Sequence, residues 1–230
     1  MARDLRLHHE LLLLALHDEK GTNAFGTMLE LGLAGAVLGE LLLEGRVELR
    51  PEGRKGKQLV TVVSRTETGD EVLDAGLKRL AEAKRRADPQ STVSRLGRIR
   101  DIRGRTAVAL CRRGVLREDE GRVLLLFKRR IYPTVDPRPE TELVERIRRA
   151  IEQPDAEVAP RTALLVTLAD AISALRSIYS GKELRGHRKR LKEIRRLAGP
   201  SGSAARGAVE AVQAAMVAIM AATAASTAAS

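Results

Sequence analysis

The histidine and cysteine residues of this chain do not form a familiar catalytic or metal-binding pattern. His8, His9 and His17 all lie in the first predicted helical region, but His8 and His17 are nine positions apart, a poor spacing for two ligands of one metal ion. Cys111 is the single cysteine, so neither an internal disulfide nor a cysteine-rich zinc site can form. We therefore expect structural or exposed histidines, a buried thiol, and neither a metal nor a cofactor.

Nucleotide-binding and acyl-transfer motifs are also missing. Gly53-Arg54-Lys55-Gly56-Lys57 has the glycines and lysine of a phosphate-binding loop, but no Ser or Thr follows and a helix is not expected there. No dinucleotide fingerprint follows a predicted strand, and no nucleophile elbow occurs. We therefore expect a protein without enzymatic activity.

Positive charge is the strongest chemical signal in the sequence. The formal net charge is +11, and it is concentrated at 94–105, 128–130 and 185–196. Arg100 and Arg103 are three positions apart in a predicted helix, so we expect them on one face, where two guanidinium groups can grip a phosphate. A solvated helix face is the alternative for this pair, and also for 185–196. The concentration of charge favours an anionic partner.

Composition excludes several other classes of protein. Aromatic residues make up 2% of the chain and Trp is absent, which argues against a stacking platform for single-stranded nucleic acid. The longest apolar runs, 11–16 and 214–222, are far shorter than the roughly 18 residues of a membrane-spanning helix. No secretory signal opens the sequence. We expect a cytoplasmic protein whose membrane contact is peripheral.

Apolar periodicity predicts a mainly helical chain. The helix at 5–16 is apolar on most of its circumference, so we expect it in the core. Helices at 25–31 and 33–43 follow it. Small residues on a shared helix face would let another backbone approach closely, and three glycines have that spacing: Gly32, Gly35 and Gly39.

Two short β-hairpins interrupt the helices. Strands at 45–49 and 58–63 are joined by a basic loop at 50–57. The second hairpin has a strand at 123–127, followed by 128–133 as the hairpin tip or a second edge strand.

The remaining segments complete a compact domain. A helix is predicted at 70–86, and a long helix at 91–113, bent at Gly104, carries the arginine pair. We predict a single domain over 1–225, with 226–230 frayed. The later segments are a helix at 137–151, an apolar stretch at 161–178, a basic stretch at 184–197 and a small-residue helix at 204–225 that docks on the core.

An ordered series of motifs resembles one known family. "LLLLALHDEKGTNAF" and "GLAGAVLGELLLEGRVEL" are followed by "TGDEVLDAGLKRL", "RIRDIRGRTAVALCRRGVL" and "VLLLFKRRIYPTVDP". This order resembles the Golgi phosphoprotein 3 family over about two thirds of the chain, and "LLVTLADAISAL" extends the similarity. The resemblance implies a mainly helical fold with a protruding hairpin, in a bacterial homologue of a non-enzymatic adaptor that binds phosphatidylinositol 4-phosphate and the cytosolic tails of glycosyltransferases.

The resemblance also implies a head-group site. Arg100 and Arg103 stand where the family has an arginine pair, and Phe25 stands at its early aromatic position. Gly26 replaces the tryptophan that follows this aromatic, and Ala34 replaces a basic residue. We therefore expect head-group selectivity to be weaker than affinity for the membrane surface.

The second hairpin adds positive charge to this expected site. Its predicted tip, Lys128, Arg129 and Arg130, suits anionic head groups, with Ile131 and Tyr132 as shallow membrane anchors. The full set of expected lipid-binding residues is Phe25, Arg100, Arg103, Lys128, Arg129 and Arg130.

We predict a peripheral membrane protein that binds anionic phospholipid and acts as a non-enzymatic adaptor. Protein clients with basic or membrane-proximal tails, and a second copy of the chain, are further candidate partners. The alternative is a winged-helix DNA-binding protein with 33–43 as recognition helix, but that segment is apolar, carries Glu40 and has no side chain suited to reading bases. A structural protein without a ligand pocket is a third reading.

Overall fold

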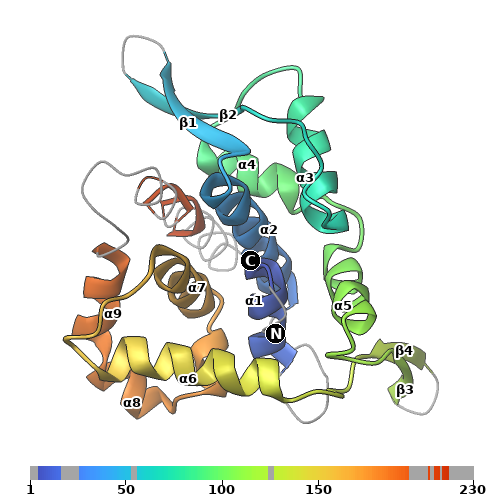
Figure 1. The fold of residues 1–230 in the computed structure, drawn as a ribbon, viewed down its shortest axis with the longest axis vertical. Coiled ribbons are helices and arrows are strands. Elements are labelled where there is room, and N and C mark those ends of the chain that lie inside the picture. The colour runs from blue at the N-terminus through green and yellow to red at the C-terminus, as the bar shows by residue number, and fades with distance from the viewer. Residues whose placement is uncertain are drawn as a thin grey trace, which may run out of the picture.

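The computed structural model describes residues 5–16, 26–52, 56–123, 127–196, 207, 210–212 and 214–217, with the backbone alone for 26–27 and 120–129. The predicted mainly-α class is confirmed (Figure 1). The helices are α1 (Leu7–Leu16), α2 (Gly26–Leu43), α3 (Glu71–Ala81), α4 (Pro89–Leu96), α5 (Ile102–Arg112), α6 (Arg138–Glu152), α7 (Pro160–Ala171), the 3-10 helix η1 (Ala174–Ser177), α8 (Gly181–Gly186) and α9 (Arg188–Arg196). The strands form two antiparallel hairpins, β1 (Val47–Glu52) with β2 (Lys57–Val62), and β3 (Asp119–Val123) with β4 (Phe127–Ile131).

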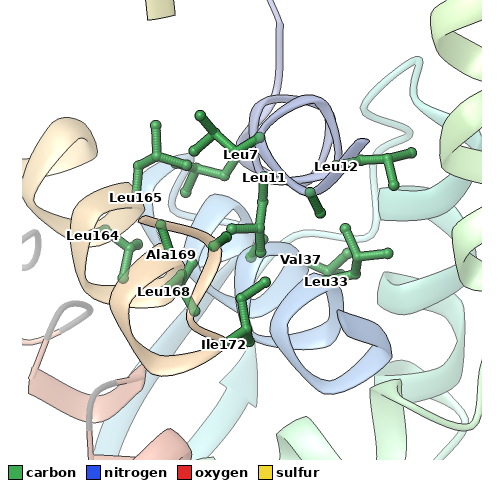
Figure 2. Packing of buried hydrophobic residues seen from close by; sticks show 14 of the residues in the cluster. Leu7, Leu11, Leu12, Leu33, Val37, Leu164, Leu165, Leu168, Ala169 and Ile172 are labelled. Carbon is green, nitrogen blue, oxygen red and sulfur yellow. The ribbon is translucent and has the colours of Figure 1, made fainter. Parts of the chain in front are cut away.

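Helices α1, α2 and α7 form the centre of the core (Figure 2). Every residue of α1 is buried, as its apolar circumference predicts. The shared face of the three glycines is confirmed, because each meets a branched side chain of α7 or of Ile172, the residue that caps its C-terminal end. A Cβ added to Gly32 would lie 2.7 Å from Ile172, Gly39 faces Leu164, and the glycine between them faces Leu168. The glycines therefore allow α2 and α7 to pack at close range.

Helix α2 corrects the expectation of two separate helices at 25–31 and 33–43. It runs unbroken through Gly32, because packing against α7 offsets the helix-weakening effect of its glycines, up to about 1 kcal/mol each. Leu33 and Leu41 are fully buried in it. A buried helix cannot enter a DNA groove, so the recognition helix of the winged-helix alternative is lost.

The long helix expected at 91–113 is instead two helices, α4 and α5, separated by a turn. Helix α4 ends at Gly97, and the turn leads to Asp101, whose left-handed backbone (φ 50°) caps α5. The Asp101 carboxylate accepts a hydrogen bond from the Gly104 backbone at 3.1 Å. A Cβ at Gly104 would collide with that carboxylate, so the glycine serves the cap and does not bend a continuous helix.

The first hairpin forms where it is predicted, but β1 continues to Glu52, three residues into the expected loop, and the second hairpin differs in its first strand. Strand β2 is held to the start of α4 by the Val60 amide, which donates to the Ala87 carbonyl at 2.8 Å. In the second hairpin, 128–130 lie within β4, opposite 120–122 of β3. Of the two expectations for 128–133, the second edge strand is confirmed for 128–131. The first strand was misplaced, because the polar segment 119–123 pairs with β4, and 124–126 of the expected strand lie outside the described residues.

The C-terminal segment docks on the core where the structure describes it. Val212 and Met216 are buried, and both approach Gly35 of α2. The predicted docking is thereby confirmed for these residues, and 226–230 lie outside the described part of the chain.

Candidate functional site

The turn between α4 and α5 positions the first arginine of the predicted pair. Arg100 is exposed and directly precedes Asp101, which caps α5. The cap bond to Gly104 fixes this turn and with it the Arg100 backbone. The site therefore begins with one exposed cation on a well-defined turn.

Arg103 lies one step inside α5 and is partly buried. Its Nε and Nη2 atoms are shielded from solvent. The two arginines thus flank the cap of α5, one in the turn and one in the helix. The expectation that they share a face of one continuous helix is wrong, because Asp101 adopts a left-handed conformation between them.

The base of the second hairpin lies close to the start of α5. Burial raises the pKa of Tyr132, with smaller effects from Glu118, Arg130 and Asp101, so this side chain is within electrostatic reach of both β4 and the start of α5. Arg130 is exposed, and its Nη1 lies 3.7 Å from Glu118. Tyr132 is 5% exposed and belongs to the core, so it is not the shallow membrane anchor that the sequence suggested.

The structure places the other expected site residues less completely. Lys128 and Arg129 belong to β4, the edge-strand alternative of the two expected placements, and their side chains lie outside the described part of the structure. Phe25 also lies outside the described residues. Ile131 is half-buried.

Some of the basic residues around α5 serve the fold. Arg105 and Arg112 both pair with Glu71 at the start of α3, at 3.0 and 3.1 Å. Arg95 donates to the Arg85 carbonyl at 3.3 Å. The charge of this region is therefore divided between helix contacts and the exposed turn that carries Arg100.

A buried polar cluster joins α1 to α3, and sequence spacing did not reveal it. His8 and His9 are fully buried, with their Nε2 atoms 3.2 and 3.3 Å from the two carboxylate oxygens of Asp70. Arg113 Nη2 lies 3.6 Å from the same carboxylate. Two imidazoles and a carboxylate are a donor set that transition metals accept. The available signal was the pair of adjacent histidines in an otherwise apolar helix.

Hydrogen bonding argues against a metal in this cluster. The Arg6 amide donates to His9 Nδ1 at 3.1 Å, so in neutral His9 the proton lies on Nε2, the atom that faces Asp70. A protonated Nε2 has no lone pair for a metal ion. Asp70 Oδ1 already accepts from the Val72 and Leu73 amides, at 3.0 and 3.1 Å, as the cap of α3. The cluster therefore acts as a structural link.

The electrostatics of the cluster agree with that role. Burial, followed by the neighbouring His8, lowers the pKa of His9 to about 2, so this imidazole stays neutral. Burial alone would raise the pKa of Asp70, but the close approach of the His8 and His9 imidazoles and the hydrogen bond from the Leu73 amide hold it below its usual value. Asp70 is therefore ionised and His9 neutral near pH 7.

A second buried network ties α1 and α2 to α6 and α7. Glu40 is 1% exposed and accepts from the Leu7 amide and from Arg161, both at 2.8 Å. Glu10 pairs with Arg146 at 2.7 Å, and burial nevertheless raises its pKa. Both carboxylates pair with arginines of other helices, and Glu10 Oε2 lies 3.8 Å from Arg161 Nε without a hydrogen bond, so we assign the network to the fold. Its signal in the sequence was an acidic residue within each of two apolar helices.

Fold and site together define a mainly helical domain with an exposed basic turn beside a projecting hairpin. None of the helices that the structure describes combines the length and hydrophobicity needed to span a bilayer. Residues 7–219 match the family described as Golgi phosphoprotein 3 (GPP34). The chain therefore belongs to the Golgi phosphoprotein 3 family.

Proposed function

We propose that this protein is a non-enzymatic adaptor that associates with anionic phospholipid surfaces, phosphatidylinositol 4-phosphate included, through the α4–α5 turn and strand β4. The observation that carries the proposal is the exposed Arg100 on a turn locked by the Asp101–Gly104 cap. A fixed turn presents its charge with little further loss of conformational freedom. Family membership supports the adaptor role.

The strength of this association follows from the kind of contacts available. One basic side chain near an anionic membrane contributes about 1 kcal/mol. Arg98 and Arg100 are exposed on the turn, and Arg130 is exposed on β4. Arg103 adds a partly buried guanidinium beside them. We therefore expect weak binding per molecule, increased when several basic groups or copies of the chain engage one surface.

Weak head-group selectivity has a structural basis. Ala34 stands where the resemblance places a basic residue, and it is fully buried between core helices. It therefore contributes no donor to a phosphate at the surface. We propose that charge density on the membrane decides binding more than the identity of the head group.

Vesicle sedimentation with a double variant tests this function. Arg100→Ala with Arg103→Ala should reduce binding to vesicles containing phosphatidylglycerol, phosphatidylinositol or its 4-phosphate by about thirtyfold, the equivalent of two contacts of about 1 kcal/mol each. The matched control is Arg79→Ala with Arg149→Ala, which removes two exposed arginines elsewhere. Thermal unfolding should show that both variants are folded.

Three outcomes would contradict the proposal. Equal losses in the two double variants would show that net charge, rather than the turn, controls binding. Unchanged binding after loss of Arg100 and Arg103 would remove the turn from the site. A parent protein that ignores every anionic vesicle but shifts duplex DNA at moderate salt would favour a nucleic-acid-binding role instead.

A further inference from the structure

Helices α8 and α9 lie on the side of the molecule away from α5 and β4 (Figure 1). A groove lined by η1, α8 and α9 collects positive charge there. Its volume is about 660 Å³. Asp170 is the single carboxylate among the described residues that line it, and it already pairs with Arg195. The basic residues that line the groove are Arg176, Arg185, Arg188, Lys192 and Arg195.

Helix α9 supplies one wall of this groove and is firmly anchored behind it. Arg190 is buried and donates to the carbonyls that end α6, including that of Ala150 at 3.0 Å. Ile194 is fully buried on the same side. The groove-lining Arg188, Lys192 and Arg195 recur at helical spacing on another face. The basic run thus has an anchoring face and a groove face, rather than one uniformly solvated surface.

The opposite wall is formed by η1 and α8, which carry Arg176 and Arg185. Within the described part of the chain, no carboxylate forms an ion pair with these two residues or with Arg188 and Lys192. Four cations brought together without counter-charges repel one another, and a bound anion would relieve that repulsion. Leucine side chains complete the lining: Leu175, Leu184 and Leu191.

We propose that this groove binds a small molecule bearing two phosphate groups. Cations on both walls match two separated anionic groups, and guanidinium groups form charge-assisted hydrogen bonds with phosphate oxygens. The volume is within the range of about 300–1,000 Å³ that is typical of small-molecule sites. The leucines offer apolar contact to the organic part of such a ligand. The site is independent of the membrane-binding role proposed above.

Calorimetric titration with inorganic pyrophosphate tests the site, with orthophosphate as the single-phosphate comparison. The full-length protein should bind pyrophosphate at least about tenfold more tightly than orthophosphate, because only pyrophosphate engages both walls. Arg188→Glu with Lys192→Glu should weaken pyrophosphate binding by at least about tenfold. The matched control, Lys189→Glu with Arg196→Glu, makes the same charge change on exposed positions outside the groove and should cost less than about threefold.

Two further variants and two competing ligands complete the test. Arg176→Gln on the opposite wall should also weaken binding, so the test does not depend on the folding of the α9 variant. Arg100→Ala with Arg103→Ala should leave pyrophosphate binding unchanged, which separates failure of this site from failure of the membrane site. Equal affinities for the two phosphates, equal losses in the two α9 variants, or no binding by the parent would overturn the proposal. Displacement of pyrophosphate by phosphatidylglycerol vesicles or duplex DNA would assign the groove to a macromolecular surface instead.

Discussion

Asp70 is a single side chain that links three helices. Its Oδ1 caps α3, while its two oxygens face His8 and His9 of α1 and Arg113 at the end of α5. Charged groups near one another at low dielectric interact strongly, so the protonation states of this cluster are coupled to the stability of the fold. The adjacent histidines therefore act on packing rather than on catalysis.

The lowered pKa of His9 predicts that the protein loses stability in mild acid. Below its ordinary pKa of 6.5, His9 binds a proton in the unfolded chain but not in the folded one, where its pKa is about 2. Unfolding is therefore favoured as pH falls below 6.5, by up to about 1.4 kcal/mol per pH unit. Asp70, whose pKa is also lowered, acts in the same direction below its ordinary value of 3.8. Urea titrations at pH 7.5 and 5 should differ by about 2 kcal/mol in unfolding free energy.

Substitution of His9 distinguishes its contribution to the pH dependence of stability from the contributions of other titrating groups. His9→Gln should flatten this pH dependence while lowering stability at pH 7.5. His187→Gln, at a half-buried position next to Tyr179, should leave the dependence as steep as in the parent. A parent protein equally stable at both pH values, or a His9→Gln variant with an unchanged slope, would contradict the assignment.

At the scale of elements, the contact between α2 and α7 depends on small residues. Gly39 faces Leu164, whose side chain is fully buried and cannot move into solvent. A larger residue must therefore separate the helices or displace neighbours in the core, and overpacking of this kind typically costs 1–3 kcal/mol.

This contact yields a prediction for helix packing. Gly39→Leu should lower the unfolding free energy by about 2 kcal/mol in urea titration, because the added side chain occupies the volume of Leu164. Gly186→Leu, at a position with open space on α8, should change it by less than about 0.5 kcal/mol. Combining Gly39→Leu with Leu164→Ala should recover part of the loss. A lack of coupling between the two substitutions would show that they do not share the contact.

Element prediction from sequence succeeded where apolar periodicity was strong. The burial of α1, the glycine face of α2 and the presence of the first hairpin all followed from local pattern, whereas β1 extends three residues beyond its predicted end. The break before α5 was missed because it depends on the left-handed Asp101 and its bond to Gly104, which helix periodicity does not report. The register of β3 was missed because its residues are mainly polar.

At the scale of the whole molecule, the sequence located the charge but not its organisation. The arginine pair was assigned to one helix face, yet Arg100 lies in the turn at 97–101 and Arg103 lies inside α5. The run at 185–196 gave no indication that Arg190 is buried as an anchor while its neighbours line a groove. Such partners come from distant segments, such as α6 and η1, so the spacing within one segment cannot identify them.

The elements that carry the two basic surfaces lie on opposite sides of the molecule, α5 and β4 on one side and α8 and α9 on the other (Figure 1). A membrane engaged by the first surface therefore leaves the groove of the second accessible. With a net charge of +11, every anionic vesicle also attracts the chain as a whole, and salt screens that attraction. Salt dependence should consequently distinguish general attraction from contacts made by the turn.

We predict that binding to phosphatidylglycerol vesicles falls steeply as salt rises from about 50 to about 200 mM, because the Debye length shortens across this range. Arg100→Ala with Arg103→Ala should give weaker binding and a shallower salt dependence, since fewer charges then lie near the surface. Arg79→Ala with Arg149→Ala should keep the slope of the parent, and vesicles of phosphatidylcholine alone should bind none of the proteins. Sedimentation across a salt series measures all four cases. Binding that is insensitive to salt would show that apolar insertion, rather than the basic turn, holds the protein on the membrane.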